Sequence, residues 1–170
     1  MKTLIFSEKP SVTKDLVEAI DPTARYHNGY YESVDYIFTN AIGHLLRLKN
    51  PEEINTKYKN WNLVSLPIQI HNKIISNYTV NEKTKKQLST VADLFKRNDI
   101  NSIVNATDPD REGELIFSTL YSYLECTKPS LRLILKDMTA EGIKEQLAVL
   151  EPGEKYNGLK ASAYSRSISD

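Results

Sequence analysis

The 170-residue sequence predicts one α/β domain, in which a mainly parallel β-sheet is flanked by helices. Hydrophobic residues make up 40% of the chain, which excludes a disordered polymer, and the length allows a single core. Short apolar runs alternate with segments whose apolar residues repeat every three or four positions. This alternation of strands and helices is typical of a parallel sheet with helices on its faces.

An apolar run and a helical repeat open the chain. Residues 3–7 are typical of a buried strand, and Val12, Leu16 and Ile20 then recur at helical spacing. In open α/β sheets, ligands bind in the crevice beyond the carboxyl ends of the strands. The residues that directly follow this first strand are therefore candidates for a site.

The second quarter of the chain predicts strands and then a long insertion. The Asn28-Gly29 pair, with tyrosines on both sides, is a hairpin signal, and a further strand is expected over residues 34–38. Residues 49–81 are rich in Pro, Asn and Lys, which predicts a loop-rich insertion that carries the single Trp61. The pattern does not define the structure of this insertion.

Helices and strands alternate regularly in the later half. Helices are expected over residues 88–95, from near Gly113, and after Thr139, which is placed to cap the last of them. Strands are expected over residues 102–106 and 131–135. The complete order of elements predicts a Rossmann-like fold with a mainly parallel sheet.

The composition excludes several classes of protein. Because 22 Lys and Arg residues balance 22 Asp and Glu residues, the chain is not an indiscriminate binder of polyanions. Residues 71–100 nevertheless hold six basic and three acidic side chains, and residues 101–125 hold five acids beside Arg111 alone. No apolar run has the length of a signal peptide or a membrane span, so we expect a cytoplasmic protein with no membrane partner. The lone Cys126 excludes a disulfide framework.

The strongest chemical signal is the run DPDREGE at residues 108–114, which places four carboxylates after the strand expected over residues 102–106. Pro109 keeps the preceding residue extended, so Asp108 and Asp110 are expected to project to one side. Mg²⁺ suits such a pair, because it prefers hard oxygen ligands and is often completed by substrate phosphate. Acids also favour a helix N-terminus by about 0.3–1 kcal/mol each, but that effect accounts for one or two of them rather than four.

The second motif is SEKPS at residues 7–11, which lies at the end of the first strand and therefore in the same crevice. Crowding by the acids is expected to raise the pKa of Glu8 and to suit it to proton transfer. Lys9 is placed to stabilise phosphate charge, and Arg111 of the acidic run is placed to hold phosphate. An exposed Glu-Lys pair in a loop that leads into a helix accounts for this motif equally well.

Two further features are less specific. His44 is placed to contact phosphate or a metal-bound oxygen, although a structural histidine is the simpler interpretation. The basic side chains of residues 71–100 are typical of a solvated face, and they also suit contact with a phosphate backbone. Their spacing lacks the interleaved aromatic residues that mark a stacking groove for single strands. These side chains are Lys73, Lys83, Lys85, Lys86, Lys96 and Arg97.

Together, the motifs at residues 7–11 and 106–114 resemble the Toprim domain of type IA DNA topoisomerases, particularly of bacterial topoisomerase III. The likeness spans the whole chain, because residues 41–46, 66–68 and 139–143 resemble further landmarks in the family order. Toprim domains of primases and type II topoisomerases carry a Glu and a D-x-D pair, but not this acidic string after a Glu-Lys-Pro-Ser loop. The combination is therefore specific.

The resemblance implies a Toprim domain over residues 1–157, with residues 158–170 beginning the segment that leads into the next domain. It implies that Mg²⁺ and single-stranded DNA meet in the crevice. The residues carried over are Glu8, Lys9 and Arg111 as catalytic groups, Asp108, Asp110, Glu112 and Glu8 as metal ligands, and His44, Arg166 and Lys9 as DNA contacts.

The resemblance also implies the chemistry of strand passage. In this family a tyrosine attacks a DNA phosphodiester, which leaves a 5′-phosphotyrosine and a free 3′-hydroxyl, and a second strand passes before religation. Mg²⁺ is expected to serve mainly in religation, and Glu8 is expected to protonate the departing 3′-oxygen. The nucleophile lies in a later domain in a Tyr-Arg-Thr or Tyr-Thr-Arg setting that none of the ten tyrosines here has, so Tyr164 is interpreted as structural. We therefore expect a fragment that relaxes DNA only together with the remaining topoisomerase domains.

Two alternatives remain open from the sequence. A stand-alone Toprim nuclease would use metal-activated water in place of the tyrosine, since a paired-carboxylate site supports that chemistry. A non-catalytic module would bind DNA or protein and keep the acids only as a structural cluster.

Overall fold

The computed structural model describes residues 1–60 and 62–169, so Trp61 lies outside the described residues. It confirms the prediction of an α/β fold built on a mainly parallel sheet. The strands of the main sheet are β1 (Lys2–Ser7), β2 (Arg25–His27), β3 (Tyr30–Glu32), β4 (Tyr36–Asn40), β7 (Ile100–Ala106), β8 (Ser130–Arg132) and β9 (Glu151–Pro152). The helices packed on it are α1 (Pro10–Ile20), α3 (Lys85–Lys96), α4 (Arg111–Tyr123), α5 (Ala140–Leu147) and α6 (Asn157–Ser169).

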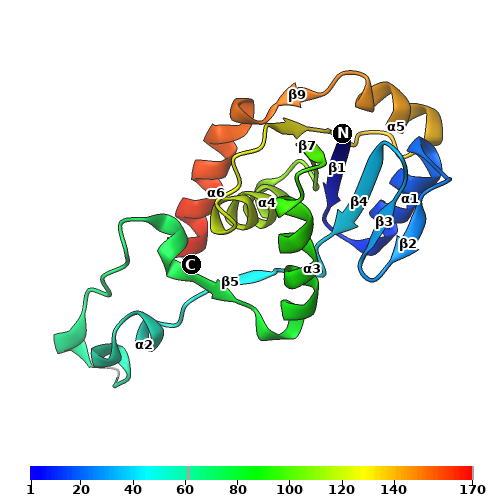
Figure 1. Cartoon of the computed structure of the whole chain (residues 1–170). Helices are drawn as coiled ribbons and strands as arrows, with labels where there is room; N and C mark the ends of the chain where they lie inside the picture. Colours follow the sequence, from blue (N-terminus) through cyan, green and yellow to red (C-terminus); the bar gives the residue numbers. More distant parts are fainter. Residues whose placement is uncertain (61, 170) are drawn as a thin grey trace.

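The main sheet has the strand order β2-β3-β4-β1-β7-β8-β9 within the described residues (Figure 1). Strands β4, β1, β7 and β8 run parallel at its centre. The hairpin of β2 and β3 joins one edge antiparallel, and β9 joins the other edge antiparallel. Because β1 and β7 are neighbours and run parallel, the loops that follow them leave the sheet at the same end of the strands.

The two faces of the sheet have separate hydrophobic cores, as the alternation of side chains along β1 requires. Leu4 and Phe6 face the core that α3, α4 and Tyr164 of α6 cover. Ile5 faces the opposite core, which α1 and α5 cover. The helices therefore flank both faces, as the sequence predicts.

Several strand boundaries differ from the expectation, among them the start of β7 at Ile100 instead of residue 102. Strand β4 begins at Tyr36 instead of residue 34, because Ser33 closes a turn by donating its backbone N–H to the carbonyl oxygen of Tyr36 at 2.9 Å. Strand β8 ends at Arg132 instead of residue 135. Leu133 makes one more hydrogen bond to the carbonyl oxygen of Asn105, and the chain then leaves the sheet.

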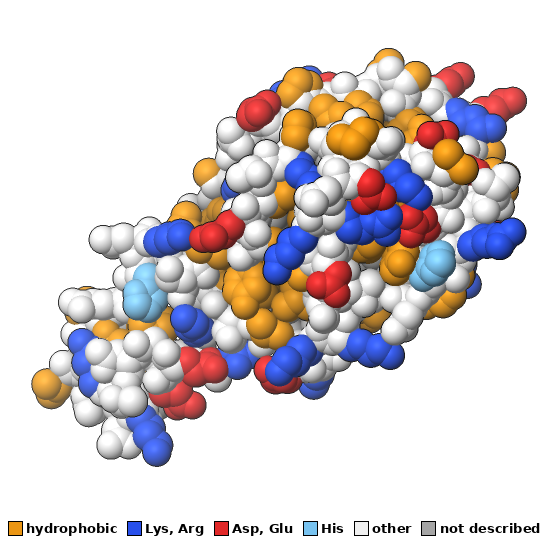
Figure 2. Space-filling model, in the orientation of Figure 1, with side chains coloured by type: hydrophobic (Ala, Val, Ile, Leu, Met, Phe, Trp, Pro, Cys, Tyr) orange, Lys and Arg blue, Asp and Glu red, His pale blue; other side chains and the backbone are white. Residues whose placement is uncertain are grey.

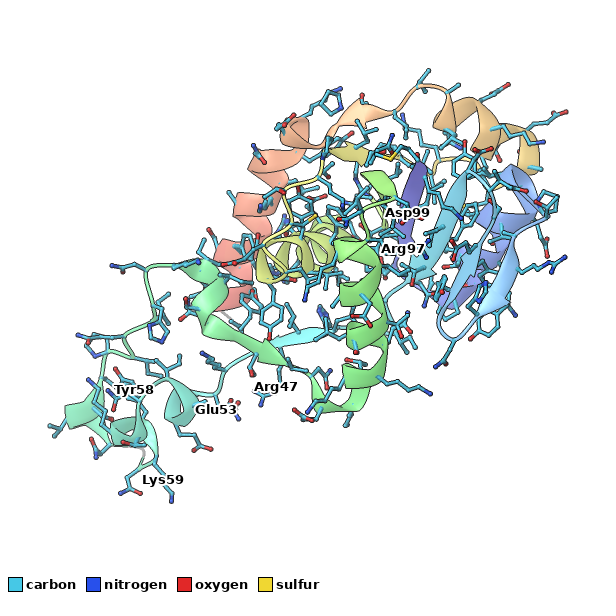
Figure 3. All side chains as sticks on the ribbon, viewed as in Figure 1. Arg47, Glu53, Tyr58, Lys59, Arg97 and Asp99 are labelled. Carbon is cyan, nitrogen blue, oxygen red and sulfur yellow. The ribbon has the colours of Figure 1, made fainter. Side chains whose placement is uncertain are left out.

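The loop-rich insertion is bracketed by a small antiparallel sheet of β5 (Leu46–Leu48) and β6 (Tyr78–Val80). It projects away from the main sheet in Figure 1 and holds α2 (Pro51–Ile54) with three 3₁₀ turns, η1 (Thr56–Tyr58), η2 (Leu63–Ser65) and η3 (Ile74–Asn77). Arg47 of β5 donates two hydrogen bonds to Glu53 of α2, at 2.7 and 2.9 Å (Figure 3). This pair joins the insertion to the body of the domain. Among the described residues, none of the helices combines the length and the apolar character that a membrane span requires.

A network of ion pairs ties the start of β1 and the end of α3 to β3. Glu32 accepts hydrogen bonds from Lys2 at 2.6 Å and from Arg97 at 2.7 and 3.0 Å. Arg97 also donates to Asp99, and the two labelled side chains lie together where α3 leads into β7 (Figure 3). Arg97 therefore belongs to this network and not to a solvated basic face. The hydrogen bonds from Arg97 hold the pKa of Glu32 at about 2, below the usual 4.5.

We expect Glu32→Gln to lower the free energy of unfolding by about 1–3 kcal/mol at pH 7, because Glu32 makes charge-assisted hydrogen bonds to two cations. A carboxyl whose folded-state pKa is lowered stabilises the fold fully above its unfolded-state pKa, and that stability is lost as the pH falls through the folded-state pKa. The Glu32 contribution should therefore disappear between about pH 5 and pH 2. Urea denaturation across this pH range measures it, with Asp35→Asn at an exposed position as the control. Equal stability of the two variants at pH 7 would contradict the assignment.

Candidate metal and phosphate site

The two motifs of the sequence meet because β1 and β7 are parallel and in register. Ser7 at the end of β1 pairs with Ala106 at the end of β7, so the SEKPS and DPDREGE loops start side by side. The backbone N–H of Asp108 donates to the Glu8 carboxylate at 3.4 Å, and the Lys9 Nζ lies 3.7 Å from the Asp108 carboxylate. The two motifs therefore lie side by side beyond the ends of these two strands.

Buried polar groups hold both loops in place. The Ser7 and Thr13 hydroxyls are 2.6 Å apart, and Thr13 donates to the Asn40 side chain at 3.1 Å, which links β1, α1 and β4. At the end of β7, the Asn105 side-chain oxygen accepts from both the backbone N–H and the hydroxyl of Thr107. The chain beyond each strand therefore leaves the sheet in a defined direction.

Glu8 is half-buried, and its pKa is raised above the usual value. Burial is the largest cause, and the negative charge of Asp108 is the next, while the N–H of Asp108 and the charge of Lys9 act in the opposite direction. Asp110 adds a smaller repulsion. The expected direction is confirmed, but removal from water contributes more than the crowding of carboxylates.

The four carboxylates of the DPDREGE run have different partners. Asp110 caps α4 by accepting the backbone N–H of Gly113 at 2.8 Å, which is the helix-terminus role. The Glu112 carboxylate lies 3.5 Å from the His44 Nε2, and both side chains are largely exposed. Glu114 is buried and faces Arg132. The run therefore divides into a cap, an exposed pair and a buried ion pair, with Asp108 facing Lys9.

This distribution decides which kind of metal site the residues fit. Among the residues described, no group of three or more His, Cys, Asp or Glu side chains is arranged to hold a metal ion. Asp108, Asp110, Glu112 and Glu8 thus do not form a closed protein cage. The proximity of Glu8 to Asp108 fits the other type of site, in which one or two carboxylates, several waters and a substrate phosphate surround Mg²⁺.

Three predicted contacts with phosphate or DNA share one hollow beside these acids. His44, Arg111 of α4 and Arg166 of α6 line a space of about 630 Å³. Asp110 and Glu112 line it too, whereas Glu8, Lys9 and Asp108 lie at the strand ends next to it. Helix α6 reaches this position because it packs along α4. The fold therefore collects the predicted residues into two adjoining groups.

Sequence reasoning missed Arg132, the last residue of β8. Its side chain is only 1% exposed and donates to the carbonyl oxygens of Asn105 at 3.0 Å and Asp108 at 2.9 Å. It also donates to the Thr107 hydroxyl, and its Nε lies 3.8 Å from the Glu114 carboxylate. From the neighbouring strand β8, Arg132 therefore fixes the start of the acidic loop, which comprises residues 108–114. The signal available in the sequence was a charged residue between two leucines, Leu131 and Leu133, in a segment expected to be a strand.

Tyr164 and Cys126 have structural surroundings. Tyr164 is buried and packs edge-on against Tyr78, with ring centroids 6.1 Å apart, and burial raises the pKa of its hydroxyl. Cys126 is a free thiol, half-buried beside the core under α3 and α4. A buried tyrosine with a raised pKa is a poor nucleophile, which agrees with the structural interpretation of Tyr164.

Comparison with known proteins places these features in a family. The family described as "Toprim domain" matches residues 3–138. The DNA topoisomerase 3 of Staphylococcus saprophyticus is 41% identical over 170 residues, and that of Bacillus cereus is 39% identical over 169 residues. These alignments cover 100% and 99% of this chain, which spans 23% of the length of either relative. A solved chain of full-length topoisomerase I from Thermotoga maritima shares the fold, with a TM-score of 0.56, 16% identity, and coverage of 88% of this chain and 21% of that one.

We expect Arg132→Met to lower the free energy of unfolding by about 3–5 kcal/mol, because it leaves the buried Glu114 without its cation. The double variant Arg132→Met with Glu114→Leu should recover part of this loss, since both charges are then removed together. Urea denaturation measures both. A loss below about 1 kcal/mol in the single variant would contradict the role assigned to Arg132.

Gly113 provides a second test of how the acidic loop is held. A Cβ at this position would lie 2.3 Å from the carbonyl oxygen of Asp108, so Gly113→Ala must displace the loop. At Gly158 of α6, no described atom beyond the chain neighbours and the adjoining helix backbone lies within 4 Å of the equivalent Cβ, and Gly158→Ala is the matched control. We expect a loss of at least about 2 kcal/mol for the first change and no loss for the second, which gains helix propensity. Similar stability of the two variants would show that the contact with Asp108 is not constraining.

Proposed function

The chain belongs to the Toprim domain family, and we propose that it forms the metal- and phosphate-binding half of the catalytic site of a type IA DNA topoisomerase. The observation that carries the proposal is the meeting of Glu8, Lys9 and Asp108 at the ends of β1 and β7. Support also comes from relatives named DNA topoisomerase 3, which align with the whole chain. The proposed substrate is single-stranded DNA.

Lys9 and Arg111 are proposed to hold the phosphate at which the strand is cut. The Lys9 side chain is 53% exposed and its ammonium lies 3.7 Å from Asp108, so this weak ion pair leaves it accessible to a phosphate oxygen. Arg111 is exposed in the adjoining hollow with His44 and Arg166, which are proposed to contact the flanking DNA backbone. A guanidinium suits this task because it binds phosphate through two parallel hydrogen bonds.

Glu8 is proposed to carry the proton for the departing 3′-oxygen and to take it back on religation. It is the carboxyl group at the end of the central strand β1, beside both Lys9 and Asp108. A group that exchanges a proton with the reacting oxygen must lie within hydrogen-bond reach of it or of a bridging water. A phosphate held by Lys9 would place its ester oxygen in that neighbourhood.

Asp108, Asp110, Glu112 and Glu8 are proposed to supply oxygen ligands for Mg²⁺, with water and DNA phosphate completing the site. When bound, Mg²⁺ would offset the negative charge of the carboxylates and of the phosphate that they face. Asp108 and Glu8 are close enough for their charges to interact, which is the arrangement that favours a cation.

The nucleophilic tyrosine is proposed to come from another part of the protein. Tyr164 is enclosed in the core, and no tyrosine lines the hollow of His44 and Arg111 in the part of the chain that the structure describes. Residues 1–157 are proposed as the Toprim unit and residues 158–170 as the start of the segment into the next domain. The proposal also places the protein in the bacterial cytoplasm, with its DNA.

In the whole protein, we expect Glu8→Ala and the double variant Asp108→Asn with Asp110→Asn to slow relaxation of negatively supercoiled plasmid by at least about 100-fold. Asn keeps the helix cap at position 110 while removing its charge, so the second variant tests the carboxylates and not the fold. Glu18→Ala at an exposed position of α1 is the control. Normal relaxation by either site variant would refute the assigned roles. Mg²⁺-dependent cleavage by the 170-residue chain alone would favour the nuclease instead.

A further inference from the structure

A second hollow is lined by residues of α1, the β2-β3 hairpin and the beginning of α3. It measures about 560 Å³. We call it the basic groove and define it by Lys14, Lys83, Lys86, Tyr26 and Tyr31, which line it together with uncharged residues. Within the described residues, no acidic side chain lines it.

The charge of the basic groove is not neutralised by the protein. Lys14, Lys83 and Lys86 are exposed, and none of them takes part in the ion pairs found among the described residues. Neither α1 nor α3 has an acidic residue in its first turn. Figure 2 shows Lys and Arg side chains along the lower edge of the molecule, near the end of α3 that leads from β6, where Asp and Glu side chains also lie. Three cations thus face one hollow without a counter-charge.

The hairpin supplies the aromatic residues that the basic stretch of the sequence lacks. Tyr26 is 65% exposed, and its ring packs edge-on against Tyr31 with centroids 5.0 Å apart. The two tyrosines lie more than fifty positions before Lys83 in the chain, so spacing along the sequence gives no sign of their meeting. Cations beside exposed aromatic rings are the combination that binds single strands, because phosphates pair with the cations while bases stack on the rings.

The walls of the basic groove are held in position by a buried side chain. Gln87 of α3 donates to the carbonyl oxygens of Gly29 in the hairpin turn, at 3.2 Å, and of Asn40 in β4, at 2.8 Å. Gly29 has a φ of +94°, and a Cβ there would lie 2.6 Å from the Gln87 side chain. The hairpin and α3 are therefore fixed to each other, which lowers the entropy cost of binding.

We propose that the basic groove binds a stretch of single-stranded DNA next to the strand segment held in the catalytic crevice. Pro10 lines the groove and directly follows Lys9, so the two sites adjoin at the SEKPS loop. This inference rests on the proposed function for the identity of the nucleic acid. It adds a second contact surface besides the hollow of His44 and Arg166.

The test measures binding of a fluorescein-labelled 15-nucleotide oligothymidylate to the 170-residue chain by fluorescence anisotropy over a range of salt concentrations. We expect the double variant Lys83→Glu with Lys86→Glu to weaken binding at least tenfold. The slope of the logarithm of the binding constant against the logarithm of the salt concentration should become less steep by about 0.7 for each lost phosphate contact. Lys136→Glu with Lys144→Glu reverses two exposed charges that do not line the groove and should leave binding nearly unchanged.

Variants of Tyr26 separate stacking from charge. Tyr26→Ala should weaken binding by roughly 5- to 100-fold, and Tyr26→Phe should retain it, because both rings stack on a base. Ultraviolet crosslinking to an oligonucleotide that carries 5-bromouracil should label the hairpin at Tyr26 or Tyr31.

The outcomes for the basic groove and for the catalytic proposal are distinguishable. Unchanged binding by the groove variants, or no binding by the parent chain at 50 mM salt, would overturn the groove inference. Equal affinity for duplex DNA would overturn its assignment to single strands. Relaxation by the whole protein tests the catalytic roles of Glu8 and Asp108 separately, so either proposal can fail while the other stands.

Discussion

The parallel pairing of β1 with β7 is the constraint on which the candidate site depends. Because Ser7 and Ala106 are register partners, two loops separated by about a hundred residues begin side by side at the carboxyl ends of these strands. A slip of one residue would turn Leu4, Phe6 and Ile5 to the wrong cores, so the buried side chains of β1 resist it strongly. The hydrophobic cores on the two faces therefore also align Glu8 with Asp108.

The acidic loop is held in place by a buried charged side chain, Arg132. Arg132 donates hydrogen bonds to the carbonyl oxygens of residues 105 and 108, and its nearest counter-charge is Glu114. A buried ion pair of this kind contributes little net stability compared with an apolar pair of the same shape, yet removing either partner is costly. In this fold the pair joins the end of β7, the first turns of α4 and β8, which are the elements that surround the acidic loop.

Sequence reasoning succeeded where strand order or a local rule was sufficient, and it failed where the partner of a side chain is set by packing between elements. The approach of Glu8 to Asp108 follows from strand order, since ligand sites lie beyond parallel strand ends. The separate partners of Asp110, Glu112 and Glu114 do not follow, because the alternation of an extended chain ends where α4 begins at Arg111. Arg132 and the tyrosines of the basic groove act through contacts across the fold, which spacing along the chain does not encode.

We propose that Glu8 and the acidic loop surround one cation site at the ends of β1 and β7. The most direct measurement is the broadening of backbone amide NMR signals as Mn²⁺ is titrated into the 170-residue chain, because a paramagnetic ion reports even weak carboxylate sites. We expect broadening centred on Asp108 and Asp110 that extends to Glu8 and Lys9 at the lowest Mn²⁺ concentrations. Broadening that begins elsewhere, or that reaches the acidic loop without reaching Glu8, would contradict it.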